Sequence, residues 1–288
     1  MKQWLVGLAC TMFSLAALAL QPYVTADKVS GGDLKATLAS VEQKLTAGGF
    51  TVIGRHTPKG LPQHASIVVT DPGLSDALKA LGGTAVVGIP IRVGVKADGT
   101  VSYMNPEYWE RGYLRKDYGR VEAAVKTVAA KLEKTLGAGK PFGGNVEADA
   151  LAKYHYMFGM EYFDERSELK EYGGFDEAIK AVRGNLAKGV AHTAKVYELS
   201  FPEKKIAVFG VATNDPETGE GWWVNKIGPD HIAGLPWEVF VVNGKVMALY
   251  GRFRTALAWP ELAMGQFMGI SNHPDATMKM MEAVAGAE

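Results

Sequence analysis

Histidine and methionine side chains in the middle of the chain could bind a soft metal. His155, Met157 and Met160 lie within six residues of one another. The C-terminal segment adds Met264, Met268 and His273. Thioether and imidazole ligands suit Cu(I) or an axial haem position. On a helix, however, His155 and Met157 would point about 200° apart. Core packing is therefore the favoured interpretation of these methionines, and a copper or haem site is the alternative.

A second candidate site consists of polar and aromatic side chains that follow two predicted β-hairpins. Its members are Tyr103, Asn105, Tyr108, Trp109, Tyr250, Arg252 and Arg254. Arg252 and Arg254 are two residues apart, so on a strand they would point the same way and could clamp an anion. Such groups at strand ends are typical of a cleft for a small organic ligand. A solvated sheet edge, or a contact between two halves of the protein, is the alternative.

The sequence contains none of the common catalytic motifs. No two histidines are spaced as in a zinc hydrolase, and no P-loop, dinucleotide-binding loop or Gly-x-Ser-x-Gly elbow occurs. The single cysteine, Cys10, lies in the apolar N-terminal segment. These observations favour a binding protein, and an enzyme without a recognisable motif is the remaining alternative.

The N-terminal segment has the pattern of a secretory signal. Lys2 precedes an uncharged, mostly apolar stretch from Trp4 to Leu20. Small residues predict cleavage after Ala26, with Ala19 as the second possible site. An uncleaved anchor helix is the alternative. Cleavage would leave a cysteine-free chain without disulfides or a further membrane span, placed in the periplasm or secreted.

The charges of the chain are balanced. It carries 31 Lys and Arg residues against 31 Asp and Glu residues. No basic surplus attracts a phosphate backbone, so we expect no nucleic-acid partner.

The elements that must position these residues occur twice in the sequence. A Gly-x-Pro segment leads into a hairpin with an Asp98-Gly99 turn, and a second leads into one with an Asn243-Gly244 turn. An amphipathic helix and two strands precede each hairpin. A Pro-Glu helix start follows each, at 106–107 and 260–261. We therefore predict an α+β protein of two similar, duplicated halves, each an antiparallel sheet with helices on one face.

The predicted boundaries follow from glycine-rich segments. A signal peptide over residues 1–26 precedes a first α+β domain over 27–137. A linker with an extra helix from 146 towards 169 occupies 138–172, and the second α+β domain occupies 173–288.

The first half resembles a known family. The phrases at 67–72, 86–90, 98–99 and 103–106 are together similar to domain of unknown function 302. The resemblance covers about residues 28 to 136 and implies an antiparallel sheet backed by two helices, as in the TATA-box-binding protein. It implies no activity and no DNA binding. If single-domain relatives pair as dimers, a tandem chain corresponds to such a pair fused into one chain. A homodimer of this chain is a further alternative. We expect a small molecule or a protein partner to bind between the halves.

Overall fold

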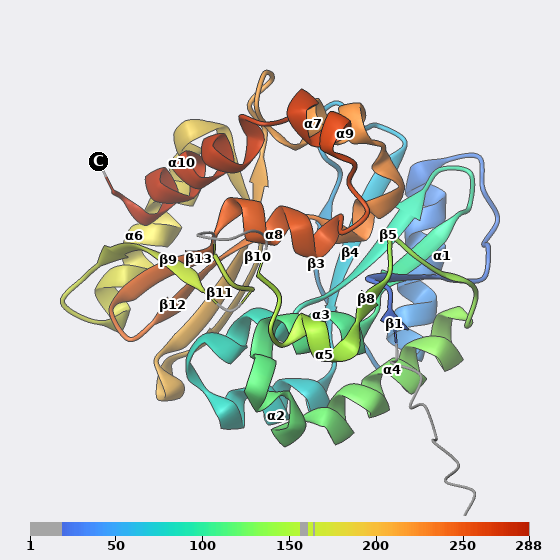
Figure 1. The fold of residues 1–288 in the computed structure, drawn as a ribbon, viewed down its shortest axis with the longest axis horizontal. Coiled ribbons are helices and arrows are strands. Elements are labelled where there is room, and N and C mark those ends of the chain that lie inside the picture. Colours follow the sequence, from blue (N-terminus) through green and yellow to red (C-terminus); the bar gives the residue numbers. More distant parts are fainter. Residues whose placement is uncertain (1–18, 156–160, 164, 288) are drawn as a thin grey trace, which may run out of the picture.

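The protein has a mixed α+β fold, as the sequence predicts. The computed structural model describes residues 19–155, 161–163 and 165–287. Every pair of hydrogen-bonded strands in these residues is antiparallel. In Figure 1, helices α6 and α10 lie at the left, helices α1 and α4 at the right, and the strands run between them. No helix of the described residues is long and apolar enough to cross a bilayer.

The first sheet has six strands in the order β3-β4-β5-β6-β2-β7. These strands are β2 (Tyr23–Thr25), β3 (Thr51–His56), β4 (His64–Thr70), β5 (Ile91–Lys96), β6 (Val101–Met104) and β7 (Pro141–Phe142). The helices of this half are α1 (Leu34–Ala47), α2 (Pro72–Leu81), α3 (Pro106–Leu114) and α4 (Glu122–Leu136), with the short 3-10 helices η1 (Gly83–Gly88) and η2 (Arg115–Arg120). Helix α1 packs on β3, β4 and β5, and α4 packs on α1, α2 and α3.

The second sheet has five strands in the order β10-β11-β12-β13-β9. They are β9 (Arg166–Glu171), β10 (Thr193–Phe201), β11 (Ile206–Thr213), β12 (Trp237–Val242) and β13 (Lys245–Leu249). The helical elements are α6 (Phe175–Lys188), η3 (Val190–His192), η4 (Pro202–Lys204), α7 (Glu220–Ile227), η5 (Pro229–Gly234), α8 (Gly251–Ala258), α9 (Met264–Gly269) and α10 (His273–Ala285). Between the sheets in sequence lie β8 (Val146–Glu147), which pairs with β1 (Ala19–Leu20), and α5 (Ala148–Leu151).

Corresponding strands follow one another in the same order across the two sheets. In each, a strand that precedes the first helix (β2 or β9) pairs with the second strand of the hairpin (β6 or β13). The predicted hairpin turns are present, with positive φ angles of 86° at Gly99 and 57° at Asn243. The hairpins β5–β6 and β12–β13 therefore occupy corresponding places in the two sheets.

Each half also covers the sheet of the other. Helix η1 of the first half contacts β11 and β12, and η5 of the second half contacts β4, β5 and β6. On β5, Arg92 and Gly94 face η5, so Val93 and Val95 point to the opposite face of the sheet. A single hydrophobic cluster spans both halves, which makes their contact part of the core.

Two predicted helices are wrong. Within the described residues, the expected helix from 146 towards 169 is reduced to α5, which is followed by a bridge between His155 and Tyr162 and by strand β9; residues 156–160 and 164 lie outside the described residues. The backbone N–H and C=O groups of β9 form their hydrogen bonds with β13, whereas in a helix they would form them within the same segment. The predicted Pro-Glu helix start at Pro260 is a turn instead, because the helix that follows the second hairpin is α8 and begins at Gly251.

The predicted boundary after Ala26 cuts through the fold. Strand β2 lies between β6 and β7, and the Tyr23 side chain is fully buried. The Tyr23 hydroxyl donates a hydrogen bond to the Ala258 carbonyl of the second half, at 2.9 Å. The first domain therefore includes residues before Asp27. If the chain is cleaved at either of the two sites that the sequence predicts, only cleavage after Ala19 would keep β2.

Candidate functional site

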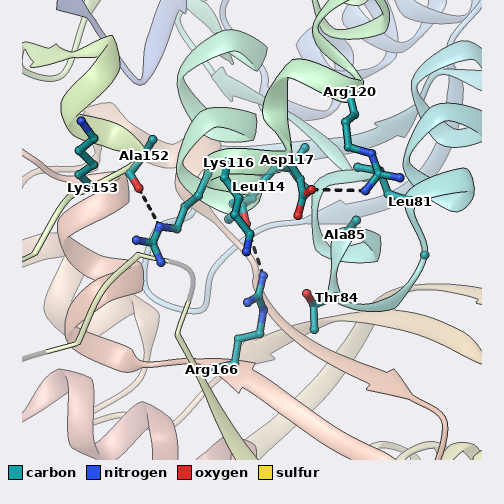
Figure 2. A pocket seen from close by; sticks show the side chains of 13 residues that line it. Leu81, Thr84, Ala85, Leu114, Lys116, Asp117, Arg120, Ala152, Lys153 and Arg166 are labelled. Atoms are coloured by element: carbon teal, nitrogen blue, oxygen red, sulfur yellow. Dashed lines mark hydrogen bonds and ion pairs between the residues drawn. The ribbon is translucent and has the colours of Figure 1, made fainter.

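A cavity of about 570 Å³ opens where elements of both halves meet. The end of α2 with η1, the end of α3 with η2, the turn after α5 and the start of β9 form its walls (Figure 2). Five cationic side chains line it, and Asp117 is the single carboxylate among its described lining residues. The cations are Arg115, Lys116, Arg120, Lys153 and Arg166.

The chain reaches this cavity through an unusual backbone turn. Helix α3 ends at Arg115, which has φ 48° and ψ −118°. This left-handed region is sparsely populated by residues other than glycine, and such conformations concentrate at binding sites. The turn redirects the chain into η2, so that Arg115, Lys116, Asp117 and Arg120 all reach the cavity.

Backbone carbonyls hold two of the arginines in place. The Arg115 Nε donates to the Ala152 carbonyl at 2.7 Å, and its guanidinium lies 5.3 Å from the centre of the Tyr162 ring. The Arg166 Nη2 donates to the Tyr113 carbonyl at 3.3 Å. Figure 2 shows Arg166 reaching the cavity from the side opposite Arg120 and Asp117. Side chains that are held in this way lose less conformational entropy when a ligand binds.

The described lining residues give the cavity a positive potential. The Asp117 carboxylate is already 3.3 Å from the Arg120 guanidinium. Lys116 and Lys153 are exposed and have no ion-pair partner among the residues that the structure describes. Cations near the C-terminus of α3 favourably oppose its dipole, which accounts for Arg115 and Lys116. That explanation does not extend to Lys153 and Arg166, which come from other elements.

The floor of the cavity is apolar. Leu114, Ala85 and Tyr113 are buried beneath the charged groups, and Leu81 is half-buried beside them. The arrangement therefore suits a molecule with an anionic group and an apolar part.

The side chains predicted to bind a ligand after the first hairpin have partners inside the protein instead. The Tyr108 hydroxyl donates to the Leu257 carbonyl at 2.9 Å, and the Trp109 Nε1 donates to the Pro22 carbonyl at 2.8 Å. Tyr103 is buried, and its hydroxyl donates to the Gly137 carbonyl. The Asn105 side chain caps α3 by accepting from the Glu107 N–H. These four residues have structural partners and do not line the cationic cavity.

Arg252 and Arg254 do not form the predicted anion clamp. Both lie on α8 rather than on a strand, so their side chains diverge. Arg252 is half-exposed, lies 3.7 Å from Asp275 and lines a small cavity of about 40 Å³. Arg254 is buried at the contact between the halves, and Tyr250 is the half-buried residue before α8.

Arg254 belongs to a buried cluster of charges that touches the wall of the cavity. Glu238 on β12 pairs with Arg92 on β5 and accepts a 2.9 Å hydrogen bond from the Arg254 Nε. Both guanidinium groups lie within 5.0 Å of the Trp109 ring centre. Burial alone would lower the pKa of Arg92, but the Glu238 carboxylate and nearby tyrosines outweigh it and raise that pKa. Arg92 also donates to the Tyr113 hydroxyl, at 3.2 Å.

Glu110 on α3 is a second buried acid near this cluster. It is 1 % exposed, and its Oε2 has no hydrogen-bond partner among the described residues. Burial raises the pKa of this carboxyl well above its ordinary value of 4.5, and the charge of Arg92 offsets only part of that effect. The folded protein therefore favours the protonated form of Glu110.

This burial gives a pH-dependent prediction. Because the folded protein binds the Glu110 proton more tightly than the unfolded chain, stability falls as the pH rises from 4.5 towards the raised pKa. We expect Glu110→Gln to unfold at higher urea concentration than the parent protein at pH 8, with the difference disappearing below pH 4.5. Glu107→Gln, at a half-buried position, is the control. A difference for Glu110→Gln that stays constant with pH would contradict the prediction.

The predicted metal ligands do not converge among the described residues. Met157 and Met160 lie outside these residues, and the His155 ring stacks on Tyr162 with centres 4.3 Å apart. Met264 and Met268 are exposed on α9. His273 is buried against Trp223, and burial lowers its pKa to about 3. The described residues contain no group of three or more His, Cys, Asp or Glu side chains that could hold a metal ion.

The sequence did not single out the residues of the cationic cavity. Arg115, Lys116 and Arg120 follow one another closely, but Lys153 and Arg166 join them only through the tertiary fold. Comparisons of the chain with protein-family models, curated proteins and solved structures found no match.

Proposed function

We propose that this protein is a binding protein that takes a small anionic molecule in the cationic cavity. The observation that carries the proposal is that the described residues lining this cavity include five cations, from η2, the turn after α5 and β9, and one carboxylate, Asp117, which is already paired with Arg120. The apolar floor adds a preference for an anion with a hydrocarbon part. The fixed Arg115 and Arg166 guanidinium groups suit a carboxylate or a phosphate.

The location and origin of the protein are part of the same proposal. An exported chain that begins at Leu20 would keep β2 and would contain no cysteine. The equal order of elements in the two sheets supports an origin by internal duplication. Antiparallel strands backed by α1 and α4 are also what the resemblance to domain of unknown function 302 implies for the first half.

The test is a panel of small anions in low-salt buffer, with binding followed by thermal shift and calorimetry. We expect inorganic phosphate, a phosphate ester or a mono- or dicarboxylate to stabilise the protein, and we expect added salt to weaken binding. Arg166→Gln removes one charge-assisted hydrogen bond and is expected to weaken binding by at least about tenfold.

The matched control is Arg183→Gln, which removes an exposed arginine that pairs with Glu198 on the second half. This variant is expected to bind the same anion with unchanged affinity. If no anion of the panel binds, or if the two arginine variants weaken binding equally, the cavity is not an anion site.

A further inference from the structure

A second cavity lies on the second half and has the opposite electrostatic character. Its volume is about 230 Å³, and η5 with the segment between α8 and α9 forms its walls. The carboxylates of Asp230 and Glu261, the His231 ring, the Trp259 indole and the Gln266 amide line it. Its described lining residues include no lysine or arginine.

The protonation of the His231 ring is fixed by its surroundings. The ring is 5 % exposed and packs against Tyr23, Phe142 and Trp259. The Nδ1 atom lies 3.0 Å from the Ala258 carbonyl oxygen. Because a carbonyl oxygen only accepts hydrogen bonds, Nδ1 must carry a proton. In the neutral ring, Nε2 therefore presents a lone pair.

This lone pair faces a carboxylate. The Nε2 atom lies 3.3 Å from the Oε1 of Glu261, whose side chain is 56 % exposed. Burial lowers the pKa of His231 below 6.5, although Glu261 and the Ala258 carbonyl act in the opposite direction. At neutral pH two hydrogen-bond acceptors thus lie side by side at the edge of the cavity, and a positively charged donor that contacts both would relieve their repulsion.

Among the described residues, Lys96 is the cation that approaches this cavity through Asp230, and it is already paired there. Lys96 is 2.5 Å from the Asp230 carboxylate, and this pairing lowers the pKa of Asp230. Lys96 lines a different cavity, beside Thr100 and Ser102. The acceptors on His231 and Glu261 are therefore left for a cation that enters from solvent.

We propose that this second cavity binds a small organic ammonium ion. Its N–H groups donate to the His231 Nε2 and to the Glu261 carboxylate, and the Trp259 indole provides an aromatic wall of the kind that attracts organic cations. A divalent metal ion is the less favoured occupant, because the described residues bring no three His, Cys or carboxylate ligands together. The site is independent of the cationic cavity.

The experiment uses n-butylammonium chloride as the probe, n-butanol as its uncharged analogue and zinc chloride as the metal, with binding followed by NMR and calorimetry. We expect n-butylammonium to bind and n-butanol not to bind. Glu261→Gln is expected to weaken n-butylammonium binding by about tenfold, the loss of one charge-assisted hydrogen bond. Because Glu261 is largely exposed, this variant is expected to keep the fold.

Two controls separate the outcomes. Asp76→Asn removes an exposed carboxylate on α2 and leaves binding of n-butylammonium unchanged. Arg166→Gln, the variant of the anion site, also leaves it unchanged, so that failure of one site is distinguishable from failure of the other. Equal binding of n-butanol, equal affinity of Glu261→Gln, or binding of zinc without binding of n-butylammonium would each overturn the proposal.

Discussion

Replacement of Glu238 by glutamine is expected to lower the free energy of unfolding by about 3–5 kcal/mol. The substitution keeps the size of the side chain but removes the charge that faces Arg92 and Arg254. Each of these arginines is at most 1 % exposed, so neither guanidinium can turn to water for compensation. Urea unfolding followed by circular dichroism and tryptophan fluorescence measures the effect.

The control for this prediction is an ion pair of the same charges on the surface. Glu168 pairs with Lys245 at 2.8 Å, and both side chains are 45 % exposed. Glu168→Gln is expected to change stability by at most about 1 kcal/mol. Replacement of Arg92, Glu238 and Arg254 together by apolar residues of similar size is expected to recover most of the loss. Equal effects of Glu168→Gln and Glu238→Gln on the free energy of unfolding would show that burial does not increase the cost of removing the carboxylate charge.

The positions of Arg92 and Glu238 also bear on the proposed duplication. Each is the second residue of the strand that follows a Gly-x-Pro segment, so the two occupy corresponding places in the two halves. In a symmetric dimer, a residue close to the two-fold axis faces its own copy, and a charge there would meet a like charge. Within one chain the two positions can differ, and here one is basic and the other acidic.

Local signals in the sequence predicted the elements whose structure depends on few residues. The Asp98-Gly99 and Asn243-Gly244 turns form the predicted hairpins, because these residues tolerate positive φ angles or come before a glycine that does. Asn105 and Pro106 begin α3, since the amide caps the helix and proline fits its first turn. The helices with regular apolar spacing, α1, α4 and α6, are present for the same reason.

The elements that the sequence did not reveal depend on contacts between distant residues. Strand β2 has three residues within the stretch interpreted as a signal, and β9 is a polar strand without alternating apolar residues. Both form because β6 and β13 offer unpaired edges. Of the aromatic and arginine side chains after the hairpins, Tyr108 and Arg254 lie at the contact between the halves, and none lines the cationic cavity.

The second large effect is expected from the choice of N-terminus. A chain that begins at Asp27 lacks β2 and the fully buried Tyr23 side chain. Loss of a buried aromatic side chain alone costs about 3–5 kcal/mol. Removal of β2 also frees the edge of β6 and deletes the Pro22 carbonyl that accepts from Trp109. Since domains are stable by only about 5–15 kcal/mol, we expect this chain to be largely unfolded by circular dichroism.

A chain that begins at Leu20 keeps all of these contacts and is expected to unfold cooperatively. Tyr23→Phe in that chain separates the ring from its hydroxyl, and it is expected to cost about 1–3 kcal/mol because the buried Ala258 carbonyl loses its donor. If the protein is exported, the intact mass of the mature form is expected to correspond to Leu20 as first residue. A stable chain starting at Asp27, or a mature form of that length, would mean that β7 can pair with β6 without β2. The backbone hydrogen bonds from Asp27 to Leu136, from Val29 to Gly99 and from Gly32 to Ala97 would then hold the N-terminal segment against α4 and the β5–β6 hairpin.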